Sequence, residues 1–402
     1  MQNKMTNLPQ GWEVKKLEEI ANIKGGKRLP KGENLLDNNT KFAYIRVADF
    51  QDNGTINLQN IKFINENTYN VLKNYKIYDD NLYISIAGTI GKSGIIPKEL
   101  NGAILTENAV KLEYIQNNIS NKFMYFFTLS NIFKTQIQTS TKIVAQPKLA
   151  ITRLKQIQIP LPPLKEQERI VGILDESFAK IDESIKILEQ DLLNLDELMQ
   201  SALQKAFNPL KDNTKENYKL PQGWEKFNFD NIFYSPSSKN YQLNTKDYLE
   251  KGCIPIIDQS KKFIIGYSNN YEKVFKINNC NNSCIIFGDH TRVLKFIDFD
   301  FIVGADGVKI LLNKDIERFN TKFLFFQLLY KDIPLLGYRR HFSVLKQNTF
   351  SIPPLKEQEQ IASHLDELSS HVKNLKQNYQ MQIKNLQELK KSLLDKAFQG
   401  RL

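Results

Sequence analysis

The stretch PPLKEQE at residues 162–168 decides the fold, because the same letters return at residues 353–359. Two other markers repeat in the same order: LPQGW at 8–12 returns at 220–224, and KAF at 205–207 returns at 396–398. Markers that return in order indicate a tandem duplication. The distance from PPLKEQE to KAF is the same in both copies, whereas the stretch from LPQGW to PPLKEQE is 21 residues shorter in the second.

The length-locked segments are predicted to be long helices, because an inserted residue would shift the register of a helix that is paired with a partner. Apolar residues recur in steps of four and three, the period of a coiled-coil seam. They are Phe178, Ile181, Ile185, Leu188, Leu192, Leu195 and Met199 in the first copy, and Ile361, Leu365, Leu368, Val372, Leu375, Tyr379, Leu386, Leu389 and Leu393 in the second. A helix of about 40 residues is roughly 60 Å long and cannot bury such a seam alone, so each copy is the simplest partner of the other. His364 and His371 are interpreted as solvated positions on the second helix.

The remaining regions are predicted to be mixed α and β domains. They consist of short β-branched and aromatic runs separated by Gly, Asn and Asp, such as NLYISIAG and CIIFG. Each also holds one aromatic helix candidate, NKFMYFFTLSN from Asn121 and TKFLFFQLLYK from Thr321. The expected organisation is α+β, with domains at 1–161 and 220–351, long helices at 162–207 and 352–402, and a polar linker at 208–219.

Composition points to an anionic partner. The 402 residues carry a formal net charge of +11, which favours nucleic acid. No apolar run reaches the roughly 18 residues of a membrane helix, so no membrane partner is expected and the chain is predicted to be cytoplasmic. The cysteines Cys253, Cys280 and Cys284 are interpreted as buried or bystander thiols, since they are odd in number and no second pair or nearby histidine completes a zinc site.

The glycine-rich stretch SIAGTIGKSG, residues 85–94, nearly matches a phosphate-binding loop. Such a loop needs a glycine where Ile86 stands, and a helix must follow it, yet Pro97 comes soon after. We therefore predict a strand, a turn and a strand. The Pro-Pro pairs stand only at the two helix starts, so an adenine methyltransferase motif is missing, and no nuclease cluster of carboxylates or nucleophilic triad is recognisable.

The repeated LPQGW starts, the repeated PPLKEQE helix starts, and the stretches GDHTRVLKFIDFDFIVGADGVKIL and GYRRHFSVLK resemble the specificity subunit of type I restriction-modification systems. The resemblance spans essentially the whole chain. It implies two target-recognition domains that each read half of a split double-stranded DNA sequence, and two helices paired antiparallel as a spacer with pseudo-two-fold internal symmetry. It also implies docking of two methyltransferase subunits and of motor-nuclease subunits, which would bring S-adenosylmethionine, ATP and magnesium, so that this chain holds no cofactor, metal or catalytic residue.

Base and phosphate contacts require side chains with hydrogen-bond donors on loops. In the first domain the candidates are Lys27, Arg28, Arg46, Thr89, Lys92, Ser93, Thr141, Lys142, Gln146 and Lys148. In the second domain they are Gln259, Lys261, His290, Thr291, Arg292, Arg339, Arg340 and His341. The clusters GDHTR and GYRRH are favoured because basic and aromatic residues converge there on glycine turns.

Two other hypotheses stay open at this point. One is a helical scaffold whose β-rich domains bind proteins, which would bind duplex DNA with little dependence on salt. The other is an enzyme that uses the near-miss loop, which Lys92→Ala would test in a nucleotide titration. For a divided DNA reader, the helices would act as a ruler, and a heptad inserted into one helix should change the permitted gap or abolish activity without altering the half-sites.

Overall fold

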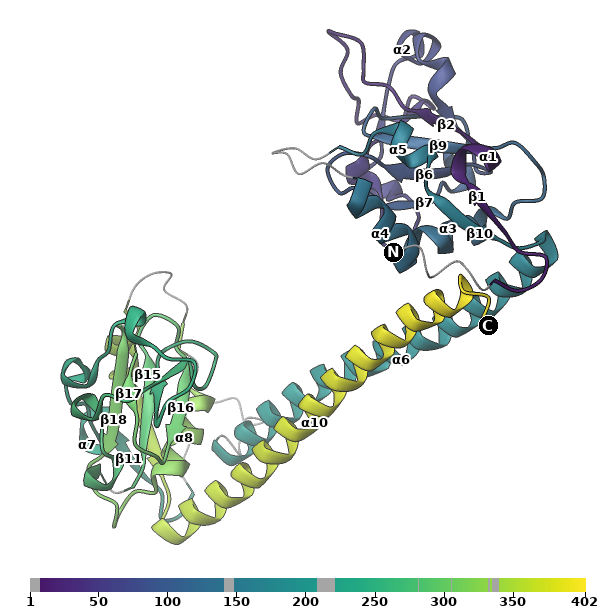
Figure 1. Cartoon of the computed structure of the whole chain (residues 1–402). Helices are drawn as coiled ribbons and strands as arrows, with labels where there is room; N and C mark the ends of the chain where they lie inside the picture. Colours follow the sequence, from purple (N-terminus) through teal and green to yellow (C-terminus); the bar gives the residue numbers. More distant parts are fainter. Residues whose placement is uncertain are drawn as a thin grey trace. The chain divides into compact units, whose positions relative to one another are not determined.

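The computed structural model describes residues 8–140, 148–207, 221–280, 282–304, 306–331, 333–334 and 340–402. The chain divides into two compact units, Met1–Leu188 with Met381–Leu402, and Glu189–Gln380 (Figure 1). Each unit contains one globular domain and one paired segment of the two long helices, α6 (Leu164–Phe207) and α10 (Leu355–Ala397).

The first domain is built on two four-stranded sheets, ordered β2-β9-β6-β7 and β4-β3-β8-β5, and a ribbon that joins β1 to β10. Among the described strands of this domain, β3 and β8 pair in parallel and the other pairs are antiparallel. The strands are β1 (Glu13–Lys16), β2 (Ala21–Gly25), β3 (Ala43–Ile45), β4 (Lys62–Phe63), β5 (Lys76–Ile77), β6 (Leu82–Ser85), β7 (Ser93–Ile95), β8 (Ala103–Leu105), β9 (Ala109–Tyr114) and β10 (Gln158–Leu161). The helices before α6 are α1 (Leu17–Ile20), α2 (Glu66–Val71), α3 (Asn121–Leu129), α4 (Asn131–Ser140) and α5 (Ile151–Lys155).

The second domain repeats this plan with a smaller second sheet. Its sheets are ordered β12-β18-β15-β16 and β14-β13-β17, and its ribbon joins β11 to β19. The strands are β11 (Glu225–Asn228), β12 (Phe233–Tyr234), β13 (Ile254–Ile257), β14 (Gly266–Ser268), β15 (Cys284–Gly288), β16 (Leu294–Ile297), β17 (Ile302–Val303), β18 (Val308–Asn313) and β19 (Thr349–Ile352). The helices are α7 (Phe229–Ile232), α8 (Thr321–Tyr330) and α9 (Phe342–Leu345). Short 3-10 turns in the two domains are η2 (Val47–Asp49), η3 (Leu58–Asn60), η4 (Lys73–Tyr75), η5 (Lys98–Leu100), η6 (Ser238–Tyr241), η7 (Thr245–Asp247), η8 (Tyr271–Lys273) and η9 (Ile277–Cys280).

In each domain one inner strand contributes to two cores, because side chains alternate across a strand. In β6, Leu82 and Ile84 pack with the aromatic side chains of α3, whereas Tyr83 packs with residues of the sheet β4-β3-β8-β5. In β15, Ile285 and Phe287 pack with α8 in the same way. Both aromatic helices predicted from the sequence therefore lie in a core.

The two long helices pair antiparallel within each unit. In the first unit, Lys390 Nζ lies 2.7 Å from Asp182 Oδ1, and Arg169 Nη2 donates to the carbonyl of Leu402 over 2.9 Å. Residue numbers therefore increase along α6 in the direction in which the numbers of the facing residues at the end of the chain decrease, so the two helices run antiparallel. In the second unit, Lys376 pairs with Asp196, and Leu203 near the end of α6 packs near the start of α10. The predicted antiparallel pairing is confirmed.

The seam of the second helix differs from the predicted one at two positions. Leu375 and Leu389 are 40% and 46% exposed, so they lie outside it. Ile383 is half-buried and Leu394 is buried in the seam instead. The apolar stripe of α10 is broad enough for either choice in the sequence, and only the partner helix selects the buried edge.

Each pair of helices is fixed to its domain by an aromatic residue of the KAF marker. The ring of Phe398 lies 5.0 Å from that of Phe123, and Phe207 lies 5.4 Å from Phe323, centroid to centroid. The end of each long helix therefore packs on the aromatic helix of the other copy's domain. Within the described residues, no helix combines the length and apolar character needed to cross a membrane.

Candidate nucleic-acid interface

In the first domain, four loops meet at one edge, which we call the first edge. Lys27 N–H donates to Leu105 O over 2.9 Å, so the GGKR loop lies against the end of β8. Ile86 N–H donates to Asn108 O over 2.8 Å, and Leu149 N–H donates to Ile86 O over 2.9 Å. These bonds bring the GGKR loop, the turn at 106–108, the SIAGTIGKSG turn and Lys148 together.

The SIAGTIGKSG turn is closed by Ser85. Its hydroxyl donates to the carbonyl of Thr89 and accepts the backbone N–H of Lys92 over 2.9 Å. Gly88 and Gly91 adopt φ of 75° and 86°, which favour glycine. The strands β6 and β7 flank the turn antiparallel, so the predicted strand-turn-strand arrangement is confirmed and no helix follows at the place where a phosphate-binding loop requires one.

Three cations of the first edge are held by carboxylates, while Lys27 and Lys148 are exposed. Arg28 donates to Glu107 over 2.8 Å, Lys92 lies 2.8 Å from Asp52, and Arg46 Nη2 and Nε donate to the two oxygens of Asp49. Burial alone raises the pKa of Glu107, but hydrogen bonds from Arg28 and Thr106 outweigh it and leave that pKa below its ordinary value. Arg46 also donates to Asn60 O, so its guanidinium organises a loop.

The second domain has the corresponding edge, which we call the second edge. Asp289 N–H donates to Gly307 O over 2.7 Å, and His341 N–H donates to Asp289 O over 2.9 Å. The Asp289 carboxylate accepts the N–H of Phe342 over 2.8 Å, so the GDHTR turn is fixed to the start of α9. Three parts therefore meet at the second edge: the turn after β15, the turn before β18 and the segment that enters α9. The corresponding parts of the first domain are the turn after β6, the turn before β9 and the segment that enters α5.

Gln259 links three parts of the second edge. Its Nε2 donates to Asp306 O over 2.7 Å, its Oε1 accepts His290 N–H over 3.1 Å, and its carbonyl accepts the Thr291 hydroxyl. Gly307 has φ of 86°, and a Cβ added there would stand 2.6 Å from Gln259 Nε2. Gln259 and Thr291 thus hold the loops in place, while Lys261, His290 and Arg340 are exposed.

The predicted contact residues that the structure describes are exposed, half-buried or buried. Lys27, Arg28, Thr89, Lys148, Lys261, His290, Thr291 and Arg340 are exposed, and Arg46, Lys92, Gln259 and Arg292 are half-buried. Arg292 donates to the carbonyl of Ile333 and has φ of 62°. Thr141, Lys142, Gln146 and Arg339 lie outside the described residues.

Two predicted contact residues are wrong because their side chains are buried. Ser93 is 4% exposed and its hydroxyl lies 2.6 Å from that of Thr128. His341 is 0% exposed, with Nδ1 2.8 Å from Asp289 O. Both residues support an edge instead of presenting donors. The sequence reasoning also missed Asp289 and Gly307, for which the Gly-Asp and Asp-Gly steps were available turn signals.

The chain thus has two mixed α and β domains, each followed by a long helix. Each domain has a basic loop edge, which is the arrangement of a protein with two separate binding domains. A sequence model of the type I restriction modification DNA specificity domain matches residues 9–192 and again residues 221–385. The chain belongs to this family.

Named relatives carry the same description. The EcoBI specificity subunit of Escherichia coli is 29% identical over 205 residues, which are 50% of this chain and 42% of that protein. The StySPI specificity subunit of Salmonella potsdam is 22% identical over 433 residues, covering 98% of this chain and 90% of that protein.

Solved structures show the same fold. The HsdS subunit of Thermoanaerobacter tengcongensis aligns over 100% of both chains with a TM-score of 0.60 and 19% identity. A chain from work on complex assembly and conformational transition of the type I R-M system aligns over 98% of this chain and 100% of its own, with a TM-score of 0.75 and 19% identity.

Proposed function

We propose that this chain is the non-catalytic specificity subunit of a type I restriction-modification complex, and that each edge reads one half of a two-part double-stranded DNA target. The observation that carries the proposal is the duplication of the edge: equivalent loops meet at the same place in both domains, held by equivalent backbone bonds, but present different side chains. A shared frame with different donors suits two half-sites of different sequence.

The exposed residues of the edges suit contact with DNA. Lys27, Lys148, Lys261 and Arg340 supply cations for phosphates, and the exposed His290 and Thr89 supply hydrogen-bond groups for groove edges. The net charge of +11 adds a long-range attraction that depends on salt. Loops of this kind both place a domain on the duplex and discriminate bases.

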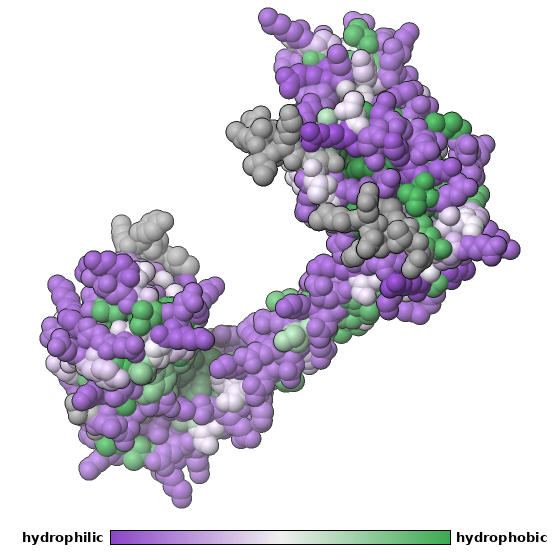
Figure 2. Space-filling view, viewed as in Figure 1, coloured by the Kyte–Doolittle hydropathy of each residue, from purple (hydrophilic) through white to green (hydrophobic). Residues whose placement is uncertain are grey.

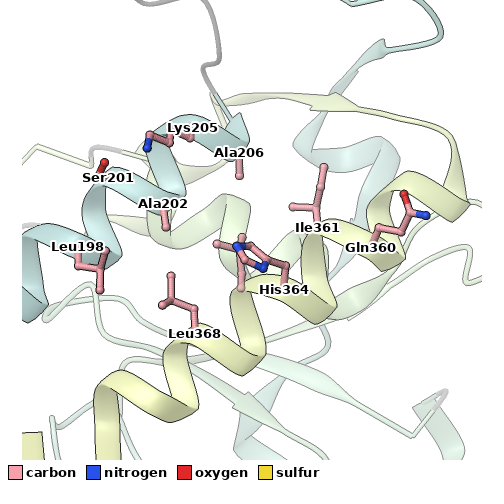
Figure 3. Close-up of a pocket in the computed structure, with 10 residues that line it drawn as sticks. Leu198, Ser201, Ala202, Lys205, Ala206, Gln360, Ile361, His364 and Leu368 are labelled. Atoms are coloured by element: carbon pink, nitrogen blue, oxygen red, sulfur yellow. The ribbon is translucent and has the colours of Figure 1, made fainter. Parts of the chain in front are cut away.

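The long helices suit docking of the partner subunits. Figure 2 shows apolar surface along the helical segments. On α6, Ile187, Leu193 and Leu198 are 53%, 58% and 48% exposed. A groove of about 580 Å³ lies between α6 and α10 in the second unit, and Figure 3 shows Leu198, Ile361 and Leu368 lining it together with His364. We assign this apolar surface to the two methyltransferase subunits, since exposed apolar patches mark partner contacts.

The chemistry is assigned to the partners. Methyltransferase subunits would bring S-adenosylmethionine, and motor-nuclease subunits would bring ATP and magnesium. This chain would supply the DNA sequence preference and the docking surface.

The test is co-expression of the full chain with its cognate methyltransferase, followed by genome-wide mapping of methylated adenines. We expect a two-part motif with a fixed gap. A His290→Ala chain should relax the sequence preference only in the half-site read by the second domain, because His290 is the exposed group of that edge assigned to base reading. Methylation with no split motif would contradict the proposal.

A further inference from the structure

A buried glutamine of the repeated PPLKEQE marker makes three hydrogen bonds at the joint between a helix and its domain. Gln167 is 1% exposed and lies in the first turn of α6. Its Oε1 accepts Ser120 N–H over 2.9 Å, and its Nε2 donates to Asn118 O over 3.0 Å and to Pro162 O over 2.9 Å. Ser120 is the N-cap of α3, so the bonds run from the start of the long helix to the start of the core helix.

The second unit repeats this arrangement at Gln358, which is 0% exposed. Its Oε1 accepts Asn320 N–H over 2.8 Å, and its Nε2 donates to Arg318 O over 2.9 Å and to Pro353 O over 2.8 Å. Asn320 is the N-cap of α8. The two glutamines therefore bond the same three kinds of backbone group in two domains whose edges differ.

Only glutamine satisfies this set of partners at that length. The two carbonyls need a donor and the backbone N–H needs an acceptor, so the amide can take only one orientation. A glutamate would set a carboxylate against two carbonyl oxygens. Any apolar substitute would remove the partner of three backbone groups, of which the carbonyl of Pro162 or Pro353 lies in a buried hydrogen bond, and folded proteins avoid unpaired buried groups.

The repeated LPQGW marker packs on the same helix start. A Cβ added to Gly11, which has φ of 85°, would lie 3.7 Å from Pro163, and one added to Gly223, with φ of 86°, would lie 3.4 Å from Pro354. In the second unit Trp224 Nε1 also donates to Glu357 over 3.2 Å. The chain entering each domain and the helix leaving it thus meet at the helix start that carries the buried glutamine.

We propose that Gln167 and Gln358 are positioning residues that fix the orientation of each recognition domain on its spacer helix, and so set how strictly the complex measures the gap between half-sites. This inference rests on the proposed function. Neither residue touches DNA.

The required accuracy explains why a rigid joint matters. One base pair added to the gap moves a half-site by about 3.4 Å and turns it by about 34° around the duplex. A domain fixed to its helix by the hydrogen bonds of a buried glutamine cannot follow such a turn without breaking them. Loosening the joint would let neighbouring gap lengths be accepted.

The experiment uses the full chain co-expressed with its methyltransferase. Gln167→Met and Gln358→Met remove the hydrogen bonds while keeping a similar side-chain length, and Gln190→Met is the matched control, since Gln190 is an exposed glutamine of α6. Each complex methylates a plasmid library that holds the two half-sites found for the unaltered chain at gaps from three base pairs shorter to three longer. Hydrogen exchange at Ser120 and Asn320 reports whether each joint has opened.

We expect Gln167→Met and Gln358→Met to raise methylation at gaps one base pair too long or too short by about tenfold or more relative to the correct gap, with half-site bases unchanged. Hydrogen exchange should rise near Ser120 in the first variant and near Asn320 in the second. A uniform fall in methylation with unchanged gap preference would overturn the inference, as would failure of both variants to give folded chains. If the unaltered chain directs no two-part motif, the proposed function itself fails.

Discussion

The two edges of the molecule hold their cations in different ways. In the first edge, Arg28, Arg46 and Lys92 each face a carboxylate, whereas in the second Arg292 donates to a backbone carbonyl and Arg340 is exposed. Paired cations have lower net charge and more fixed geometry, while exposed cations offer charge to any phosphate. The first edge also has the exposed Lys27 and Lys148, so we expect its salt-dependent affinity to come from those two lysines and not from the paired cations.

The parts beneath the edges are the same in the two copies. The buried glutamine, the positive-φ glycine of LPQGW and the phenylalanine of KAF occupy equivalent places in both units. A frame that is held constant while its loops diverge allows the reading surface to change without changing how each domain is attached. We therefore expect equivalent substitutions in the frame to have similar effects in the two domains, and substitutions in one edge to have effects that the other edge does not share.

The largest matched effect should come from the KAF phenylalanines. Phe398→Ala and Phe207→Ala should each lower the local free energy of unfolding by about 3–5 kcal/mol, because a buried aromatic ring is lost and a cavity remains. Hydrogen exchange should show the loss in α3 for Phe398→Ala and in α8 for Phe207→Ala.

Leu389→Ala is the control for these substitutions, since Leu389 is 46% exposed on the same helix as Phe398. It should change the free energy of unfolding by no more than about 0.5 kcal/mol. If the protection of α3 from hydrogen exchange were unchanged in Phe398→Ala, the end of α10 would not stabilise the first domain in the way proposed for both units.

The next effect should be confined to the second edge. Gly307→Ala forces a side chain into a backbone with φ of 86° and against Gln259. The strain is about 1–2 kcal/mol, so binding of the second half-site should weaken about tenfold. Electrophoretic binding assays with each half-site mutated in turn measure this, and an equal loss at both half-sites would count against it.

The frame could be predicted from the sequence because the motifs that indicate it are local and occur twice. PPLKEQE, KAF and the apolar period located both helices, and the aromatic runs located α3 and α8. The seam at Leu375 was misplaced because several stripes of α10 are apolar, and burial depends on the partner helix. Periodicity gives the presence of a helix more reliably than the edge that it buries.

The edges were only partly readable. Glycine turns and basic residues indicated loops that the structure brings together at each edge, and the exposed Lys148, His290 and Arg340 lie where those loops meet. Ser93 and His341 were misassigned because a polar residue next to a turn can equally support it from inside, and their hydrogen bonds reach Thr128 and Asp289 at 35 and 52 residues' distance. Such long-range pairs have no local signature.

A smaller effect should come from one exposed cation in each edge. Arg340→Ala and Lys148→Ala should weaken binding about equally for all sequences and reduce the slope of log affinity against log salt by about 1 each, as expected for one lost phosphate contact. Titrations at several salt concentrations measure the slope. A change in sequence preference instead of slope would assign that residue to base reading.

The smallest effect should come from releasing Arg28 of the first edge. Because the pKa of Glu107 is lowered in the folded chain, its ion pair with Arg28 is complete at neutral pH and is lost only as the pH falls through a value below the ordinary glutamate range. Glu107→Gln should therefore make Arg28 available at neutral pH and tighten duplex binding by about two- to fivefold at low salt. The gain should shrink at high salt, and Arg28→Gln combined with Glu107→Gln should abolish it. A looser complex in the single variant would show that the ion pair itself positions the GGKR loop for binding, and that the first edge depends on pairing where the second depends on exposure.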